Sequence, residues 1–554
     1  MMQMTGAELI VRLLERQGIE TVAGVPGGAI LPFYDALSHS EKIHHVLARH
    51  EQGAGFMAQG MARVSGRPEV CLASSGPGAT NLVTAIADAK LDSIPLVAIT
   101  GQVPLPMIGT DAFQEVDTYG MTIPITKHNY LVRDANELLD VVPAAFRLAM
   151  SGRPGPVLID VPKDVQNQRI EFEDYPAPVV PAPLPAPDLA AIEQAAQMIN
   201  DAAQPVLYLG GGVIASGASH LAVTLAEQAG LPTTMTLMAL GAMPVDHPLS
   251  IGMLGMHGAR YTNYVLEEAD LLVCIGARFD DRAIGKAAQF CPKAKIVHVD
   301  IDPSELDKIK TAHVGIHGDV SQVLEALLPQ VHVKLREDWL AQVDSLRSRF
   351  PLATPNIDNP RSHYGLVQAV ADALDDEAVI TTDVGQHQMW VAQAYPFRRP
   401  RQWLTSGGLG TMGFGLPAAI GAALAEPTRT VVCFSGDGSL KMNIQEMATA
   451  AEEELNVKIV LMNNNALGLV YQQQNLFYGK RTMASNYKRA TDFLKVAEGF
   501  GLETVDLDTA DDPAATLAAA LKRPGPCLIH CTIDREEFVY PMVPPGGANS
   551  EMIG

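Results

Sequence analysis

The chain has 554 residues, 47% of them hydrophobic and 18% charged, and its 40 basic and 62 acidic residues give a net charge of −22. At roughly 100–200 residues per domain, this length predicts three or four domains, and the apolar fraction excludes a mainly disordered chain. The negative charge repels nucleic acid and anionic lipid, so we expect neither as a partner. The apolar stretch at 413–425 is too short to span a bilayer, and the first six residues lack a signal-peptide pattern.

Two proline-rich stretches, 176–187 and 351–361, divide the chain. Proline removes amide donors and favours extended backbone, so both stretches are expected to be connectors. The predicted units are an N-terminal domain at 1–175, a central domain at 188–345, a C-terminal domain at 362–540 and a C-terminal arm at 541–554.

In each predicted domain, continuous apolar runs alternate with helical patterns, as at 94–99, 271–275 and 430–434. Such runs are typical of parallel strands that are buried on both faces of a sheet. We therefore expect an α/β protein with three doubly wound domains and mostly parallel sheets. Ligands of such sheets bind beyond the carboxyl ends of the strands.

The cysteines show no metal-ligand spacing, and several lie in apolar, strand-like runs such as 272–275. A buried and reduced thiol is the ordinary state of a cysteine in such a run. We therefore expect reduced cysteines and a cytoplasmic protein.

Asp437 and Asn464 follow two consecutive predicted strands of the third domain. Mg²⁺ takes hard oxygen ligands and leaves coordination positions for phosphate oxygens. Gly436 and Gly438 allow the backbone to approach a diphosphate, and a helix starting near Ser439 would offer free N–H groups. Each segment alone is an ordinary turn sequence. Together they predict a site for a magnesium-bound diphosphate.

The GDGS and NN segments resemble the thiamine-diphosphate signature, and further motifs match from end to end of the chain. These motifs lie at 25–35, 49–60, 75–83, 109–115, 276–282, 383–390 and 410–423. As a set they resemble the catalytic subunits of the biosynthetic acetolactate synthase (acetohydroxyacid synthase) family. The resemblance implies decarboxylation of pyruvate on thiamine diphosphate and transfer of the hydroxyethyl unit to pyruvate or 2-oxobutyrate. The products would be 2-acetolactate and 2-aceto-2-hydroxybutyrate, in the first common step of valine, leucine and isoleucine biosynthesis.

Thiamine chemistry needs a carboxylate that holds a proton on the pyrimidine ring, which favours the tautomer that can deprotonate the thiazolium carbon. Glu51 resembles the family's residue for this task; outside its motif it would be read as an exposed first-turn glutamate. Met412 resembles the apolar wedge that folds the cofactor, and Gly410 resembles a carbonyl acceptor for its amino group. Gln386 and His387, in the motif at 383–390, resemble further cofactor contacts.

Gly27 and Gly28 follow a predicted strand and can present N–H groups to a developing alkoxide, although a plain turn explains them equally well. A cation is also needed for the carboxylate of the acceptor, and Arg282 is the best candidate by resemblance. The remaining substrate-side residues implied by the resemblance are Gln114 and Lys163, with Phe113 and Met256 as apolar walls.

The chain departs from the family at two positions. Gln473 stands where family members commonly have a tryptophan that shapes the acceptor pocket for 2-oxobutyrate, so we predict a weak preference for that acceptor. Ala466 stands where relatives often have glutamate. Because that metal contact is made by the main-chain carbonyl, we still expect Ala466 to be a ligand.

Residues 210–215 fit a dinucleotide-binding glycine pattern, but no acidic residue follows at the expected offset, so a tight turn is about as good an explanation. The family resemblance implies a site for FAD, with a structural role. The residues that resemble this site are Arg153, Gly210, Gly211, Gly212, Met256, His257, Gly276, Arg278, Asp280, Asp300, Ile301 and Asp319.

The resemblance implies a homodimer as the smallest active unit, because Glu51 and the metal segment of family members meet across a subunit interface. A dimer and a tetramer both remain open. The resemblance also implies a separate regulatory small subunit and an arm at 541–554 that orders over the active site.

A flavin-linked enzyme of the pyruvate oxidase type is the alternative, since it shares the three-domain organisation. The motifs at 109–115 and 276–282 favour the synthase. A pyridine-nucleotide dehydrogenase would leave Glu51 and the Asp437 segment unexplained.

Overall fold

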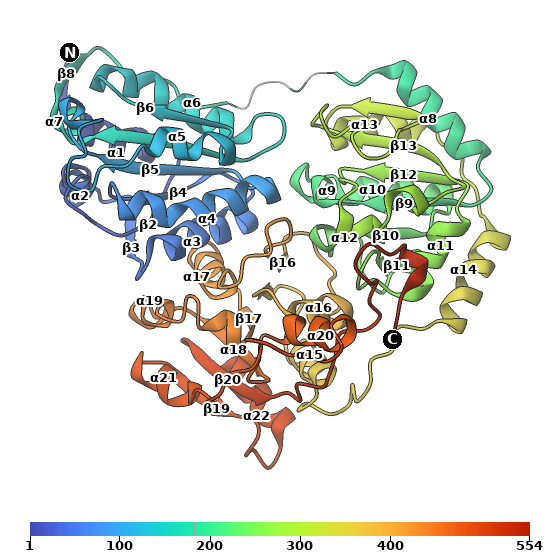
Figure 1. The fold of residues 1–554 in the computed structure, drawn as a ribbon. Coiled ribbons are helices and arrows are strands. Elements are labelled where there is room, and N and C mark those ends of the chain that lie inside the picture. The colour runs from blue at the N-terminus through green and yellow to red at the C-terminus, as the bar shows by residue number, and fades with distance from the viewer. Residues whose placement is uncertain (181–183, 185) are drawn as a thin grey trace.

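In the computed structural model, which describes residues 1–180, 184 and 186–554, the apolar runs form three sheets of six parallel strands. Helices flank each sheet (Figure 1), so the predicted α/β class with mostly parallel sheets is confirmed. The sheets draw their strands from residues 21–162, 205–317 and 379–532. The predicted connector at 176–187 lies partly outside the described residues, and the exact domain boundaries stay predictions.

The first sheet has its most buried strands at its centre, where every residue of β4, β5 and β7 is buried. In sheet order its strands are β3 (His44–Leu47), β2 (Thr21–Gly24), β4 (Glu69–Ala73), β5 (Leu96–Gln102), β7 (Pro156–Pro162) and β6 (His128–Leu131). Its helices are α1 (Gly6–Arg16), α2 (Leu31–Leu37), α3 (Glu51–Ser65), α4 (Pro77–Asp92), α5 (Thr118–Thr122), α6 (Leu138–Met150) and α7 (Lys163–Asn167). A separate antiparallel pair joins β1 (Met2–Thr5) and β8 (Arg169–Phe172).

The central sheet has β9 and β12 as neighbours in its middle, so the turns that follow these two strands share one edge. In sheet order its strands are β11 (Ser250–Met253), β10 (Thr233–Met235), β9 (Pro205–Leu209), β12 (Leu271–Ile275), β13 (Lys295–Asp300) and β14 (Val314–His317). Its helices are α8 (Leu189–Asp201), α9 (Gly211–Ala215), α10 (Ser219–Ala229), α11 (Arg260–Glu268), α12 (Asp281–Ile284), α13 (Val320–Leu327) and α14 (Glu337–Arg349).

The third sheet pairs β17 with β18 in parallel register, Gly436 lying opposite Met462, so both strands end at the same edge. In sheet order its strands are β16 (Trp403–Leu404), β15 (Val379–Thr382), β17 (Val431–Gly436), β18 (Val457–Asn463), β20 (Cys527–Thr532) and β19 (Glu503–Asp506). Its helices are α15 (His363–Ala373), α16 (Gln386–Ala394), α17 (Gly415–Ala425), α18 (Asp437–Leu440), α19 (Glu446–Glu452), α20 (Gly468–Phe477), α21 (Phe493–Gly499) and α22 (Pro513–Lys522).

Helices α3 and α17 join the first and third domains (Figure 1). The two backbones touch because glycine occupies the crossing: a Cβ on Gly60 would overlap the carbonyl of Ala418, and a Cβ on Gly421 would overlap the carbonyl of Met57. This interface therefore fixes the position of α3, and with it the first-turn residue Glu51, against the third domain.

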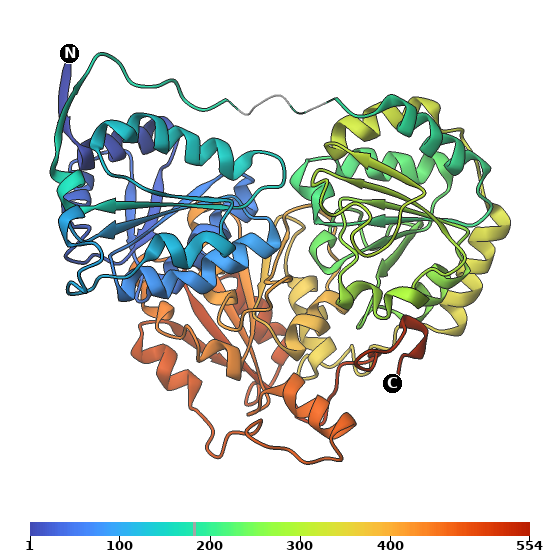
Figure 2. The same cartoon turned by 45° about the horizontal axis from the view of Figure 1, so that its top comes forward.

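The C-terminal arm crosses from the third domain and ends on the central domain (Figure 2). Val543 N donates to the carbonyl oxygen of Met256 (3.0 Å), and Asn549 Nδ2 donates to that of Ala283 (2.9 Å). The arm thereby contacts Met256 and Ala283, two residues of the central domain that lie next to Arg282.

Among the helices of the described residues, none combines the length and the apolar character that crossing a bilayer requires.

Glu69, the first residue of β4, gives a pH-dependent prediction. Its side chain accepts from Ser65 Oγ (3.2 Å), the residue is 8% exposed, and burial raises the pKa of Glu69 from 4.5 to about 7. A raised folded-state pKa means that the folded state is favoured while Glu69 is protonated, below about pH 4.5, and loses this stability as the pH rises through about 7. We expect Glu69→Gln, which stays neutral, to gain up to about 3 kcal/mol over the natural chain across this range. Thermal unfolding midpoints of both proteins at pH 5 and pH 8 test this; a difference that does not grow with pH would contradict it.

Candidate active site

The carboxyl edge of the third sheet brings the predicted metal residues together. Asp437 follows β17 directly and Asn464 follows β18 directly, so the two residues end adjacent parallel strands. The helix that begins here is a single turn, α18, and it starts at Asp437 itself rather than near Ser439. Ser439 Oγ donates to the carbonyl oxygen of Val384 (2.7 Å), which ties this turn to the segment after β15.

Asp437 is the most unusual group of this edge. It is 1% exposed, and neither carboxylate oxygen has a hydrogen-bond partner among the described residues. Burial raises the pKa of Asp437, and the Lys441 ammonium, 3.8 Å from Oδ2, opposes that rise. A buried carboxylate without hydrogen bonds is costly, and one ammonium at 3.8 Å makes a hydrogen bond to neither of its oxygens. The site therefore fits a hard divalent cation.

Asn464 is oriented by its neighbours. Its Nδ2 donates to Gln386 Oε1 (3.0 Å), and its Oδ1 accepts from the backbone N–H of Ala466 (3.2 Å). Gln386 Nε2 in turn donates to Gln472 Oε1 (3.1 Å). The predicted residues Gln386, Asn464 and Ala466 thus form one continuous hydrogen-bonded group beside Asp437.

His387 lies against the backbone of Gly436, the last residue of β17. A Cβ on Gly436 would come within 2.8 Å of His387 Nδ1, so only glycine leaves room for the ring. Burial lowers the pKa of His387 to about 3, which keeps the imidazole neutral at physiological pH. Its Nε2 has no hydrogen-bond partner within the described part of the chain and is free to contact a ligand.

The segment with Gly410 and Met412 lies over the same edge. Gly410 has φ +70°, a left-handed conformation that glycine adopts at little cost. A Cβ on Gly438 would lie 3.6 Å from Met412 Cε, so the methionine covers the glycine turn after β17.

Asp383, at the end of β15, has a positioning role that sequence reasoning missed. Its Oδ1 accepts from the N–H groups of Gly413 (2.8 Å) and Gly415 (2.9 Å), and its Oδ2 accepts from Ser435 Oγ (2.7 Å). Asp383 thereby fixes the backbone directly after Met412. The sequence signal was its place in the motif at 383–390, but no feature of that motif separates it from its neighbours.

A second group of predicted residues gathers at the carboxyl edge of the first sheet. Glu51 is the first residue of α3, and its Oε2 accepts from Asn81 Nδ2 (2.9 Å). A Cβ on Gly27 would meet Ser74 Oγ at 2.6 Å, whereas a Cβ on Gly28 would meet no atom, so Gly28 faces open space. The glycines thus keep the turn after β2 close to the end of β4, beside Glu51.

Gln114 and its neighbour Phe113 belong to the first domain, as does Lys163, whereas Arg282 belongs to the central domain. Gln114 has φ +59°, and its backbone carbonyl packs on Gly76, close to α4. Phe113 is 87% exposed. Lys163 begins α7. Arg282 belongs to the central domain, where its exposed guanidinium lies 3.6 Å from Met256 Sδ.

No hydrogen bond or ion pair joins the Glu51 group to the Asp437 group in the parts of the chain that the structure describes. The two groups lie on different domains, although α3 and α17 hold those domains together. A single chain thus carries both halves of the predicted site without a direct contact between them.

Except for Arg153 of the first domain, the predicted flavin residues lie at the carboxyl edge of the central sheet. The glycine turn has a packing explanation, because Gly212 N donates to the carbonyl oxygen of Gly276 (2.9 Å) and a Cβ on Gly212 would meet Gly276 Cα at 2.8 Å. Asp280 caps α12, and Asp319 caps α13. Burial raises the pKa of Asp280.

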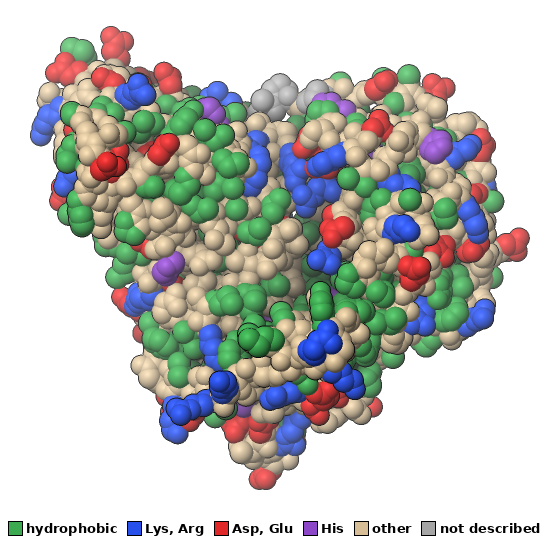
Figure 3. Space-filling model, in the orientation of Figure 1, with side chains coloured by type: hydrophobic (Ala, Val, Ile, Leu, Met, Phe, Trp, Pro, Cys, Tyr) green, Lys and Arg blue, Asp and Glu red, His purple; other side chains and the backbone are tan. Residues whose placement is uncertain are grey.

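The other flavin candidates connect this edge to its surroundings. Asp300 ends β13, with Ile301 after it, and accepts from the N–H of Asp302 (2.8 Å). Arg153 reaches from the first domain to Glu305 (2.8 Å). Arg278 belongs to the turn between β12 and α12. Figure 3 shows Lys and Arg side chains at the top of the hollow between the first and central domains.

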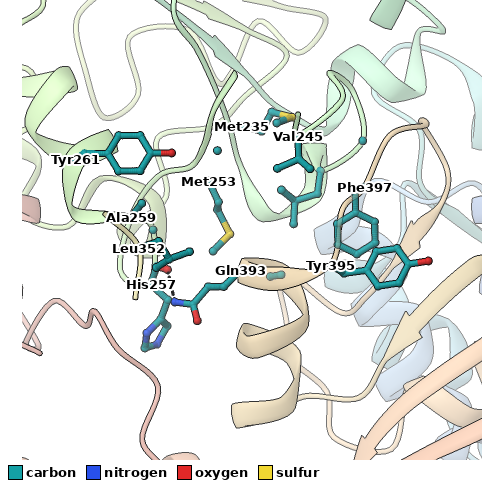
Figure 4. Close-up of a pocket in the computed structure, with 15 residues that line it drawn as sticks. Met235, Val245, Met253, His257, Ala259, Tyr261, Leu352, Gln393, Tyr395 and Phe397 are labelled. Carbon is teal, nitrogen blue, oxygen red and sulfur yellow. Dashed lines mark hydrogen bonds between the residues drawn. The ribbon is translucent and has the colours of Figure 1, made fainter. Parts of the chain in front are cut away.

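A pocket of about 90 Å³ lies where the central domain meets the third domain (Figure 4). Its walls include Met253, Tyr261 and Phe397; His257 also lines it, although its imidazole is directed toward the carbonyl oxygen of Pro541 in the C-terminal arm. Gln393 Nε2 donates to the carbonyl oxygen of His257 (2.9 Å). His257 is the one predicted cofactor residue in this lining, so the pocket is separate from the Asp437 and Glu51 groups.

Comparison with known protein families accounts for all three domains. Residues 4–121 match the N-terminal TPP binding domain of thiamine pyrophosphate enzymes, residues 192–327 match their central domain and residues 383–531 match their C-terminal TPP binding domain. The chain is therefore a member of the thiamine pyrophosphate enzymes, and thiamine diphosphate is its cofactor.

Individual relatives narrow this class. The chain is 66% identical to the acetolactate synthase isozyme 1 large subunit of Escherichia coli K12, over 99% of this chain and 98% of that protein. It is 47% identical to the isozyme 2 large subunit of the same organism, over 99% of each chain. It is also 47% identical to chloroplastic acetolactate synthase 1 of rice, over 99% of this chain and 87% of that protein. The chain belongs to the acetolactate synthase large-subunit family, which confirms the resemblance and does not favour the pyruvate oxidase alternative.

Proposed function

We propose that the chain is the catalytic subunit of an acetolactate synthase, which condenses pyruvate with a second 2-oxo acid and releases CO₂. The acceptors are pyruvate and 2-oxobutyrate, and the reaction belongs to branched-chain amino acid biosynthesis. The observation that carries the proposal is Asp437, a buried carboxylate without a hydrogen-bond partner in the described residues, beside the Asn464–Gln386 pair. All the cysteines are free and buried, which supports a cytoplasmic location.

Asp437, Asn464 and the carbonyl oxygen of Ala466 would hold Mg²⁺, and the backbone at Gly436–Ser439 would face the diphosphate. When bound, thiamine diphosphate supplies a thiazolium carbon that adds to the 2-oxo acid and accommodates the electron pair left by decarboxylation. His387 stays neutral because burial lowers its pKa to about 3, so its unpartnered Nε2 can contact the cofactor without adding charge.

Glu51 would hold a proton on the pyrimidine N1′ atom. Its carboxylate already accepts from Asn81 at 2.9 Å, which leaves its other oxygen, Oε1, facing Gly78. Met412 would support the bend of the cofactor, and Gly410 would accept a hydrogen bond from its amino group. The left-handed backbone at Gly410 supports this role, because it turns the peptide group of Gly410 away from the direction it would have in an extended chain.

The substrate side would use residues of the first and central domains. Gly28 faces open space and can offer its N–H to a developing alkoxide. Gln114 and Lys163 would orient the 2-oxo acids. Arg282 would pair with the acceptor carboxylate, with Phe113 and Met256 as apolar walls. The high exposure of Phe113 in one chain supports a position at a subunit interface.

A second copy of the chain would complete the site. Because the Glu51 group and the Asp437 group make no direct contact in one chain, we infer that Glu51 of one subunit faces the metal site of another, in a homodimer or a tetramer of such dimers. The relatives are named large subunits, which supports a separate small subunit for regulation.

FAD would occupy the carboxyl edge of the central sheet in a structural role. The close approach of Gly210 and Gly212 to Gly276 brings backbone groups to this edge, which suits contact with a nucleotide. Asp280 and Asp319 cap helices, so any contact they make with FAD would be additional to that structural task.

The proposal is tested with the purified full chain and pyruvate, in the presence and absence of thiamine diphosphate, Mg²⁺ and FAD. Acetolactate is measured as acetoin after acid treatment, and consumption of O₂ or a quinone is followed in parallel. We expect acetoin only with thiamine diphosphate and Mg²⁺, and no oxidant consumption. Oxidant consumption without acetoin would overturn the proposal in favour of an oxidase.

Acceptor choice gives a further prediction. Gln473 lies in α20 with an exposed side chain, where family members commonly have tryptophan. We expect the natural chain to prefer 2-oxobutyrate only weakly, and Gln473→Trp to raise that preference about tenfold, because an ethyl group gains roughly 1–3 kcal/mol from an apolar pocket. Competition between the two acceptors at equal concentration measures the product ratio. A strong excess of acetohydroxybutyrate from the natural chain would contradict the prediction.

A further inference from the structure

The segment at 405–411, directly before Met412, is held by a helix of another domain. Asp92 of α4 accepts from the backbone N–H groups of Gly407 (3.1 Å) and Gly408 (2.7 Å). Asp88, one turn earlier, accepts from Ser406 Oγ and from Thr411 Oγ1 (3.1 Å). We call residues 405–411 the tethered segment, because its donors converge on these two carboxylates.

Arg63 of α3 completes this cluster. Its guanidinium donates to Asp92 Oδ2 (2.9 Å) and Asp88 Oδ2 (3.3 Å), and also to the carbonyl oxygen of Thr405 (3.0 Å). It lies 4.9 Å from the centre of the Phe414 ring. The side chains of both aspartates are fully buried, and that of Arg63 is 5% exposed.

The two buried aspartates and the tethered segment stabilise each other. Two buried carboxylates face one guanidinium, so the hydroxyl and N–H donors of the tethered segment must satisfy the remaining oxygens. Burial, together with the charge of Asp92, raises the pKa of Asp88 to about 6. Moving the segment would leave buried carboxylate oxygens without donors, and this penalty holds it in place.

The backbone after Met412 is fixed from the opposite side by Asp383, through Gly413 and Gly415. Met412 therefore lies between two anchors, one from the third domain and one from α4 of the first domain. Gly410 lies inside the tethered segment and has a left-handed backbone that depends on this course.

We propose that Asp92 and Asp88 are positioning residues that fix the pyrimidine-side contacts of the cofactor site, Gly410 and Met412, from the first domain. The inference rests on the proposed roles of those two residues. It makes cofactor recognition depend on both domains of one chain, in addition to any contribution from a second copy.

The experiment separates the pyrimidine side of the cofactor from its diphosphate side. Calorimetric titration of the full chain, freed of cofactor, measures affinity for thiamine diphosphate with Mg²⁺ and, separately, for inorganic pyrophosphate with Mg²⁺. For Asp92→Asn we expect thiamine diphosphate to bind about tenfold more weakly, because a charge-assisted acceptor of two N–H groups is lost, while pyrophosphate binding changes less than about twofold. Thr411→Val, which removes one hydroxyl donor to Asp88, should show the same pattern more weakly.

Glu69→Gln is the matched control, since Glu69 is a buried carboxylate of the same domain without contact to the tethered segment. It should leave both affinities unchanged. Equal weakening of both ligands, or unchanged affinity for both in the two variants, would overturn the inference. If Asp92→Asn fails to fold, Thr411→Val alone decides. Failure of the natural chain to bind thiamine diphosphate would instead overturn the proposed function.

Discussion

Replacing Glu51 with glutamine will lower the rate of acetolactate formation by at least a hundredfold and leave binding of thiamine diphosphate and Mg²⁺ nearly unchanged. An amide cannot hold the N1′ proton as a carboxylate does, and positioned proton transfer contributes about 10²–10⁴-fold to enzymatic rates. The amide preserves the size of the side chain and its hydrogen bond from Asn81, which is 2.9 Å long in the structure. Steady-state acetoin assays and calorimetric titration of the cofactor measure the two effects separately.

The control for this prediction is Glu69→Gln, which makes the same chemical change at the start of β4, the strand end opposite the proposed active edge. It should retain the natural turnover. Undiminished carboligation by Glu51→Gln would refute the assigned role of Glu51. A large loss of cofactor affinity would show that Glu51 mainly binds rather than activates.

Asp437→Asn will change the stability of the protein in opposite directions with and without cofactor. Burial raises the pKa of Asp437, so in the cofactor-free chain this residue favours the folded state when protonated and loses that contribution as the pH rises through its folded-state pKa. A neutral amide avoids the charge burial, and we expect a gain of about 1–3 kcal/mol at pH 8 in the absence of Mg²⁺. With the cation ligand removed, saturating thiamine diphosphate and Mg²⁺ should no longer add the roughly 3 kcal/mol that a ligand at a hundred times its Kd supplies.

Thermal unfolding midpoints of the natural chain and Asp437→Asn, each with and without Mg²⁺ and thiamine diphosphate, provide the four measurements. Lys441→Met is a useful comparison, because Lys441 Nζ lies 3.8 Å from Asp437 Oδ2 and opposes the rise of its pKa. That variant should destabilise the cofactor-free chain. A lower cofactor-free midpoint for Asp437→Asn, together with an intact cofactor-dependent shift, would show that Asp437 is structural and binds no metal.

The fold class could be predicted because buried parallel strands appear in the sequence as uninterrupted apolar runs. The proximity of the two proposed metal residues could be predicted for a related reason. Asp437 and Asn464 each follow such a run, and neighbouring parallel strands end at the same edge. To predict that the two residues lie close together, it was therefore enough to know that their strands are neighbours, which the alternation of apolar runs and helices indicated.

The anchors of the cofactor segment could not be predicted in the same way. Asp88 and Asp92 are four residues apart on α4, a spacing that usually describes a solvated helix face, and Arg63 is remote from both in sequence. Only the course of residues 405–411 over α4 shows that these charges are buried. A loop that covers a helix far away in the sequence leaves no periodic sequence pattern in the loop or in the helix.

The glycine turn at 210–212 illustrates a second limit. Its pattern matched a nucleotide-binding turn and a simple tight turn equally well. The structure adds a packing requirement, because Gly212 and Gly276 approach each other through their backbones. That requirement concerns a pair of turns, and a single local motif does not reveal it.

The glycine crossing of α3 and α17 limits which motions are available during turnover. Because Gly60 and Gly421 bring two backbones into direct contact, the first and third domains cannot shear past one another without steric overlap. The central domain takes no part in this crossing; it carries Arg282 and supports the C-terminal residues. We therefore expect any opening of the substrate path during turnover to come from movement of the central domain, while Glu51 keeps its position relative to the third domain of its own chain.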